Sequence, residues 1–120
     1  MAEDLKQAIT EFLDIEGVTT VALIGRDGFV IDSASRIEVD LDAIGGIVAN
    51  AIGSSEIIGK DFLLGSLTQY LLEFQKGKVI IAAAGEDILA LITNTDAIIG
   101  GVRYAIRKKM GTLLKVLEKE

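Results

Sequence analysis

The sequence lacks several residue types on which common functional sites depend. Its 120 residues include no cysteine, histidine, proline or tryptophan, and aromatic residues make up only 5% of them. Without cysteine and histidine there is no thiol nucleophile, no base for a Ser-His-Asp triad and none of the usual ligands of zinc or haem. These absences remove much of ordinary enzyme chemistry, and we expect no catalytic residue, no metal site and no cofactor. Half of the residues are apolar, so we expect an aliphatic core.

Positive charge and long apolar runs are also scarce. The chain has 12 Lys and Arg residues against 18 Asp and Glu residues, a net charge of -6. Proteins that bind nucleic acid need a basic footprint for the phosphates, which this balance does not provide. The N-terminal MAEDLKQ lacks the blocks of a signal peptide, and no run approaches the roughly 18 apolar residues of a membrane span. We expect a cytoplasmic protein with no nucleic-acid partner and no membrane span.

The pattern of apolar residues predicts one α+β domain over residues 1–120. The spacing of Leu5, Ile9 and Phe12 predicts a helix, whereas the β-branched run VTTVALI and the following RDG turn predict a hairpin. Asp40 is expected to cap the second helix and Gly59 to end it. The expected elements are, in order, a helix at 3–13, strands at 18–24 and 29–33, a helix at 41–59, strands at 65–74, 78–85 and 88–94, and a helix from about residue 96. The order is αββαβββα.

One motif resembles a phosphate-binding loop but is interpreted as structural. GSSEIIGKD, residues 53–61, has five residues between its glycines where the motif has four, and Asp61 stands where a hydroxyl should bind magnesium. A helix rather than a strand precedes it. We therefore predict no nucleotide site here.

The basic residues offer two weaker hypotheses. Arg26 and Arg36 lie in loops from which an arginine could reach into the active site of another protein and stabilise phosphoryl transfer. Solvated loop arginines are far more common, so this role has a low prior. The basic group in the last helix is interpreted as a solvated face, and it comprises Arg103, Arg107, Lys108 and Lys109.

The expected helix at 41–59 contains glycines in its interior, each of which costs about 1 kcal/mol relative to Ala. At 100° per residue, Gly45, Ala49 and Gly53 form a track beside the apolar stripe, with Gly46 close to it. The track permits close packing on the chain's own sheet or the approach of a second helix. Its offset from the core favours the second helix. The apolar stripe expected to face the core comprises Leu41, Ile44, Val48, Ala51, Ile52 and Ile58.

The strand expected at 65–74 has apolar residues on both faces. Alternation places Leu67 and Leu71 on one face and Tyr70, Leu72 and Phe74 on the other. If the last three strands run outward, this strand is an edge whose unpaired backbone groups can pair with a second copy. Two-fold symmetry would then bring the two glycine-containing helices side by side. We therefore expect a homodimer with a continuous sheet.

Two segments together resemble the roadblock/dynein light-chain family. GVTTVALIGRDGFVIDS, residues 17–33, is similar to the opening hairpin of the family, with its Gly-Val entry, apolar strand and D-G turn. NTDAIIGGVRYAIRKKM, residues 94–110, is similar to the closing pattern of an Asn-containing loop, a glycine and a V-R-Y-like helix start. The order of elements also matches, so the resemblance spans nearly the whole chain.

The resemblance implies a five-stranded antiparallel sheet with helices on both faces, a roadblock fold of the profilin- and longin-like kind. It also implies a dimer that acts as a non-enzymatic regulator or scaffold of a Ras-like small GTPase, as in MglB-type members. The implied partner surface on the second helix comprises Asp42, Gly45, Gly46, Ala49, Asn50 and Gly53. The implied dimer edge comprises Ser66, Thr68, Tyr70 and Leu72. A small-molecule sensor module and a purely structural assembly subunit remain as alternatives.

Overall fold

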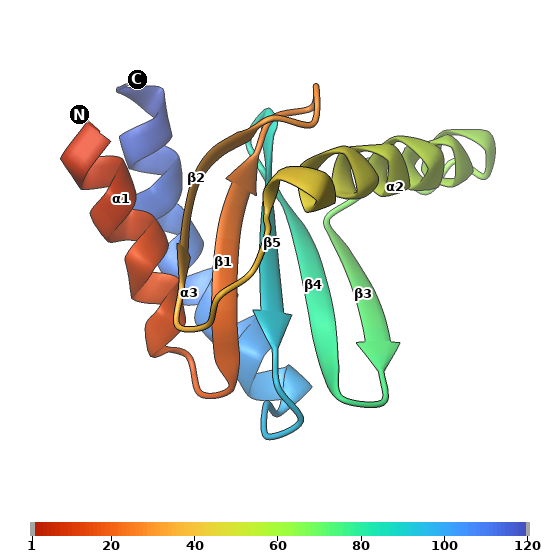
Figure 1. Ribbon diagram of the computed structural model, residues 1–120. Helices are drawn as coiled ribbons and strands as arrows, with labels where there is room; N and C mark the ends of the chain where they lie inside the picture. The colour runs from red at the N-terminus through yellow and green to blue at the C-terminus, as the bar shows by residue number, and fades with distance from the viewer. Residues whose placement is uncertain (1, 120) are drawn as a thin grey trace.

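A single five-stranded antiparallel sheet organises the protein (Figure 1). The computed structural model describes residues 2–119, and the strand order in the sheet is β2-β1-β5-β4-β3. This order confirms the predicted fold and places β2 and β3 at the two edges. The strands are β1 (Val18–Ile24), β2 (Val30–Ser35), β3 (Gln69–Phe74), β4 (Gly77–Ala84) and β5 (Asp87–Thr93).

Helices cover both faces of the sheet. α1 (Ala2–Thr10), the 3-10 helix that follows it (Glu11–Asp14) and α3 (Ile99–Glu118) pack on one face, whereas α2 (Asp42–Asp61) lies on the other. Each face therefore has its own apolar core. The larger one joins Phe12 and Ile106 to the sheet, and the smaller one joins Val48 and Ile52 to it. Within residues 2–119, no helix is both long and apolar enough to span a membrane.

The central strands read as nearly continuous apolar runs because both of their faces are covered. In β1, every residue but Thr19 is buried, and Thr20 is a buried polar residue whose hydroxyl lies 2.8 Å from the hydroxyl of Ser35. Burial of such aliphatic side chains contributes about 1.5–3 kcal/mol each. The sheet is thus a rigid support for α2.

The predicted stop of the second helix at Gly59 is wrong, because α2 continues to Asp61. A Cβ on Gly59 would lie 2.5 Å from the carbonyl oxygen of Gly65, so this glycine serves the close return of the chain. The helix ends instead in a Schellman motif, in which Leu64 N–H donates to Gly59 O (2.7 Å) and Leu63 N–H donates to Lys60 O (3.3 Å). Leu63 therefore has φ of 58°, a left-handed conformation that usually belongs to glycine.

Other element boundaries also differ from prediction, and three of them have a clear physical reason. β3 begins at Gln69 rather than Gly65, because the return from α2 occupies the residues before it. Gly77 begins β4, so only Gln75 and Lys76 form the turn that was expected at residues 75–78. α3 begins at Ile99 rather than near residue 96, since the Asn94 side chain accepts a hydrogen bond from Asp96 N–H and holds a turn there (2.9 Å).

Candidate interaction surface

The C-terminal half of α2 projects beyond the sheet that supports its N-terminal half. Figure 1 shows α2 crossing the sheet and continuing past β3. All of the buried residues of α2 lie in its first eleven positions: Gly45, Val48 and Ile52. Ile58, which was predicted to face the core, is 56% exposed because no sheet lies beneath it. Within the protomer this half of the helix is held by the Arg26–Glu56 ion pair and by the return of the chain past Gly59, while Ile57 and Ile58 stay exposed.

The structure divides the predicted glycine track into an inner and an outer part. Gly45 is buried, and a Cβ there would lie 2.1 Å from the carbonyl oxygen of Gly28 in the β1–β2 turn. Ala49 is half-buried against the core under α2. Gly46 and Gly53, by contrast, have nothing within 4 Å of an added Cβ. The first part allows close packing on the protomer's own hairpin, and the second part leaves the outer face of α2 almost free of side chains.

The remaining predicted residues of the helix surface also lie outward. Asp42 is exposed at the helix start, where its N–H donates to Asp40 Oδ1 (3.1 Å), and Asn50 is exposed between Gly46 and Gly53. α2 begins at Asp42, one residue later than predicted, and Leu41 rather than Asp40 holds the N-cap position. The exposed small residues form one continuous face of α2, where another backbone can approach closely.

Exposed apolar side chains surround this small-residue face, and most of them were missed from the sequence. We call the segment Phe62–Leu64 the apolar knob, because its side chains are exposed by 72%, 91% and 73%. It follows α2 directly and lies at the overhanging end. Together with Ile57, it gives this end of the protein a large exposed apolar area, and Ile47 is exposed nearer the start of α2. The available signal was the wheel position of these isoleucines, away from the core stripe.

The β3 edge adjoins the overhang. Tyr70 and Leu72 are half-buried and Phe74 is exposed, whereas Ser66 and Thr68 lie just before the strand and are exposed. Leu67 packs with Tyr70 on the α2 side, so the predicted grouping of Leu67 with Leu71 is wrong because the strand begins after it. A hollow of about 360 Å³ separates α2 from this edge, and its lining includes Ile58, Leu64, Leu67 and Tyr70.

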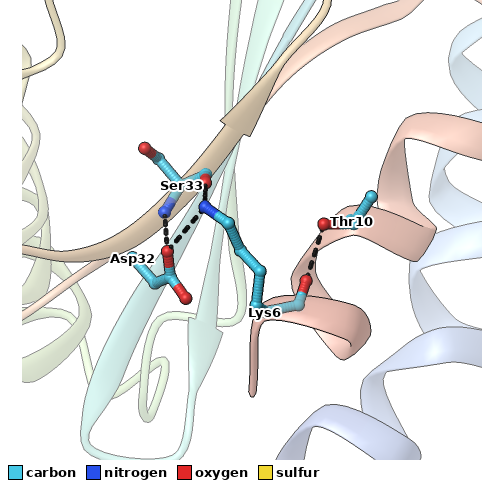
Figure 2. A network of polar contacts seen from close by, with 4 residues as sticks. All are labelled: Lys6, Thr10, Asp32 and Ser33. Carbon is cyan, nitrogen blue, oxygen red and sulfur yellow. Dashed lines mark hydrogen bonds and ion pairs between the residues drawn. The ribbon is translucent and has the colours of Figure 1, made fainter. Parts of the chain in front are cut away.

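The opposite edge of the sheet is partly capped by a side chain of α1. Figure 2 shows Lys6 of α1 reaching β2, where its Nζ donates to Asp32 Oδ1 (3.0 Å) and to the carbonyl oxygen of Ser33. The same Asp32 oxygen accepts a hydrogen bond from Ser33 N–H (2.8 Å). Both backbone groups of Ser33 are therefore satisfied without another strand. Among residues 2–119, no side chain binds the backbone of β3 in this way, so β3 is the open edge.

Neither loop arginine is available to enter a partner's site in this conformation. Arg26 Nη1 lies 2.6 Å from Glu56 Oε1, and its Nε donates to Glu86 O (3.2 Å). Arg36 Nη2 donates to Leu13 O (3.0 Å). The Arg26 contact ties the β1–β2 turn to α2 and the β4–β5 turn. Both arginines act in the protomer's own packing.

Negative charge collects at the same turns. Partial burial, together with the charges of Glu86 and Asp27, raises the pKa of Asp87 above 3.8, and nearby Arg26 offsets part of the effect. A raised pKa in the folded state means that the folded protein binds this proton more tightly than the unfolded chain. Stability therefore falls as the pH rises from 3.8 through the folded pKa, and the loss is complete above that pKa.

We predict that Asp87→Asn raises the thermal midpoint near neutral pH but has no effect at about pH 3, where the carboxylate is protonated in both states. Thermal unfolding across that pH range checks this result. Glu38→Gln is the control, because it removes one negative charge from an exposed carboxylate in the loop before α2. An equal pH profile for the two variants would contradict the prediction.

Comparison with known proteins assigns the chain to a family. Residues 5–94 match the model of the Roadblock/LC7 domain, and they are most of the 120-residue chain. The chain belongs to the Roadblock/LC7 domain family. An uncharacterised protein of Methanocaldococcus jannaschii is similar to this roadblock chain, with 28% identity over 104 residues, 87% of this chain and 91% of that one.

Solved structures share the roadblock fold closely. MglB of Myxococcus xanthus superposes with a TM-score of 0.89 at 19% identity, covering 97% of this chain and 96% of that chain. An MglB structure described as having a tetrameric arrangement gives a TM-score of 0.87 at 22% identity, covering 98% and 90%. At such identities the likeness establishes the fold, and the function must be argued from the surface.

Proposed function

We propose that this roadblock domain forms a homodimer that binds a Ras-like small GTPase without catalysing a reaction itself. The single observation that supports the proposed dimer is the overhang of α2 beyond the open β3 edge. Most of the apolar side chains there are exposed in the protomer, and the edge strand has a neighbouring strand on one side only. A second copy related by two-fold symmetry supplies both at once.

The geometry of such a dimer follows from the two features. Antiparallel pairing of the two β3 strands gives a continuous sheet, and each overhanging α2 then lies across the sheet of the partner. Gly46 and Gly53 let the two α2 helices pack closely, since neither residue has a side chain to hold them apart. Burial of the apolar knob provides the free energy that small residues alone do not.

The family assignment supports a Ras-like GTPase as the partner. The roadblock/dynein light-chain family, to which the chain is assigned, includes regulators and scaffolds of Ras-like GTPases, and paired second helices form the docking surface in MglB-type members. Here the exposed Asp42 and Asn50 stand on that surface. A regulator of this kind repositions residues of the GTPase and supplies none of its own. This agrees with the engagement of Arg26 and Arg36 inside the protomer.

The test is to mix the protein with the Ras-like GTPase from its own genome, loaded with GTP or with GDP. We expect a complex on size-exclusion chromatography with light scattering, with one nucleotide state preferred, and faster GTP hydrolysis if the protein is an activator. Absence of a complex in both states would contradict GTPase binding. Stable assembly that is indifferent to nucleotide would favour the purely structural subunit.

A further inference from the structure

The face of the sheet opposite α2 carries a second unoccupied feature, a groove beside α3. α3 packs against α1 on this face, and β3 and β4 extend beyond it. The resulting hollow of about 570 Å³ runs between α3 and the β3–β4 pair. We call it the α3 groove, and its lining is Thr68, Gln69, Ala82, Ala83, Arg103, Ile106, Arg107, Met110, Gly111 and Leu114.

The floor of the α3 groove is apolar and its rim is basic. Ala82 and Ile106 are buried at the bottom, and Met110 is half-buried beside them. Arg103 and Arg107 are exposed on the rim, and Arg103 Nε donates to Gln69 Oε1 (2.9 Å). Among residues 2–119, neither arginine forms an ion pair with a carboxylate. This is notable in a chain of net charge -6, where acidic residues are in excess.

The groove continues past Leu114, where the charged residues on its border change from basic to acidic. A second hollow of about 470 Å³ shares Leu114 and reaches Leu117, and it is bordered by the acidic residues Glu86, Asp87 and Glu118. At this end, partial burial and the charge of neighbouring Glu86 raise the pKa of Asp87. From Arg103 to Leu114 the wall of α3 spans about 17 Å, or roughly three helical turns. The channel is thus basic at one end, acidic at the other and apolar between.

We propose that the α3 groove binds an amphipathic helix of a partner protein, with acidic residues beside Arg103 and Arg107 and basic residues beside Glu86 and Glu118. Gly111 lies on the wall with nothing within 4 Å of an added Cβ, so the partner backbone can approach α3 closely. Apolar residues at helical spacing would cover Met110 and Leu114. Acidic residues at the first turns and basic residues at the last also suit a helix dipole, so the partner helix runs parallel to α3.

A second copy of this chain does not fit the groove. The apolar face of α1 is already buried in the protomer's core, and so is that of α3. The other side of α3 carries Lys108 and Lys115, and two such basic surfaces would repel each other. The floor of the groove lies on the opposite face from α2, so the dimer proposed above leaves it open, although Thr68 and Gln69 on its border adjoin the β3 edge.

The probe for this proposal is a synthetic fluorescent amphipathic peptide of about 16 residues, long enough to span the groove as a helix. It carries Glu on its first turns, Leu at helical spacing and Lys on its last turn. We expect binding with a micromolar Kd by fluorescence anisotropy. The double variant Arg103→Gln/Arg107→Gln should weaken this binding at least tenfold, whereas Lys108→Gln/Lys115→Gln, with the same loss of charge on the same helix, should change it less than twofold.

Gly111→Leu provides a test that misfolding cannot mimic. The new side chain occupies the wall of the groove, and Leu has a higher helix propensity than Gly, so the variant should bind the peptide at least tenfold more weakly while its thermal midpoint rises. No binding by the wild-type protein, equal loss in both double variants, or equal binding of a scrambled peptide would overturn the proposal. Unchanged binding by a variant that fails to dimerise would show that this site is separate from the proposed dimer.

Discussion

Gly45→Ala should destabilise the protomer by about 2 kcal/mol, although alanine is the better helix former. The new Cβ would lie 2.1 Å from Gly28 O, and that atom belongs to the backbone of the β1–β2 turn. The turn cannot yield easily, because Gly28 has φ of 92° and Gly25 N–H is bonded to Phe29 O across it (2.9 Å). Chemical denaturation of the variant and the wild type measures the difference.

Gly46→Ala is the matched control, one residue along the same helix. Nothing lies within 4 Å of its added Cβ, so the variant should gain up to about 1 kcal/mol in the free energy of unfolding. Unfolding at several protein concentrations separates protomer stability from dimer formation, because only the latter depends on concentration. Equal effects of the two substitutions would show that Gly45 is not held against the hairpin.

The fold was predictable because its signals are local. The turn at 26–28 and the short turns between the last three strands each predict one antiparallel hairpin, and the structure has all three, whereas the pairing of β1 with the distant β5 followed only from the family resemblance. The ends of the helices were harder to predict from the sequence. Gly59 is a reasonable stop by its residue type, but its real neighbour is Gly65, a contact made only after the chain has turned back.

The surface was predictable only in outline for the same reason. Gly45 and Gly53 were assigned to one track, although 100° per residue sets them about 80° apart on a helical wheel, and one is covered by Gly28 whereas the other is open. The wheel cannot show where the supporting sheet ends, so it assigned Ile58 to the core. The basic residues of α3 also gave no sign of a groove, because Ala82 and Ala83 reach its floor from a strand distant in sequence.

Leu63→Gly should weaken the homodimer by at least a hundredfold while making the protomer more stable. Leu63 is 91% exposed and has φ of 58°, so its side chain costs the protomer roughly 1 kcal/mol of backbone strain with little burial in return. In the proposed two-fold dimer the residue would be buried twice, and burial of Leu is worth about 1.5–3 kcal/mol each time. The total of about 3–6 kcal/mol corresponds to a factor of roughly a hundred or more in Kd.

Sedimentation equilibrium gives the dimer Kd, and denaturation at low concentration gives the stability of the protomer. Lys60→Gly tests whether any glycine at this helix end has the same effect, since Lys60 is exposed in the last turn of α2 and glycine there lowers helix stability. Backbone strain at an exposed residue of the protomer is retained when that residue serves a function in another state, such as a dimer. An unchanged Kd in Leu63→Gly would therefore remove Leu63 from the interface and leave β3 pairing and α2 packing as the support for the dimer.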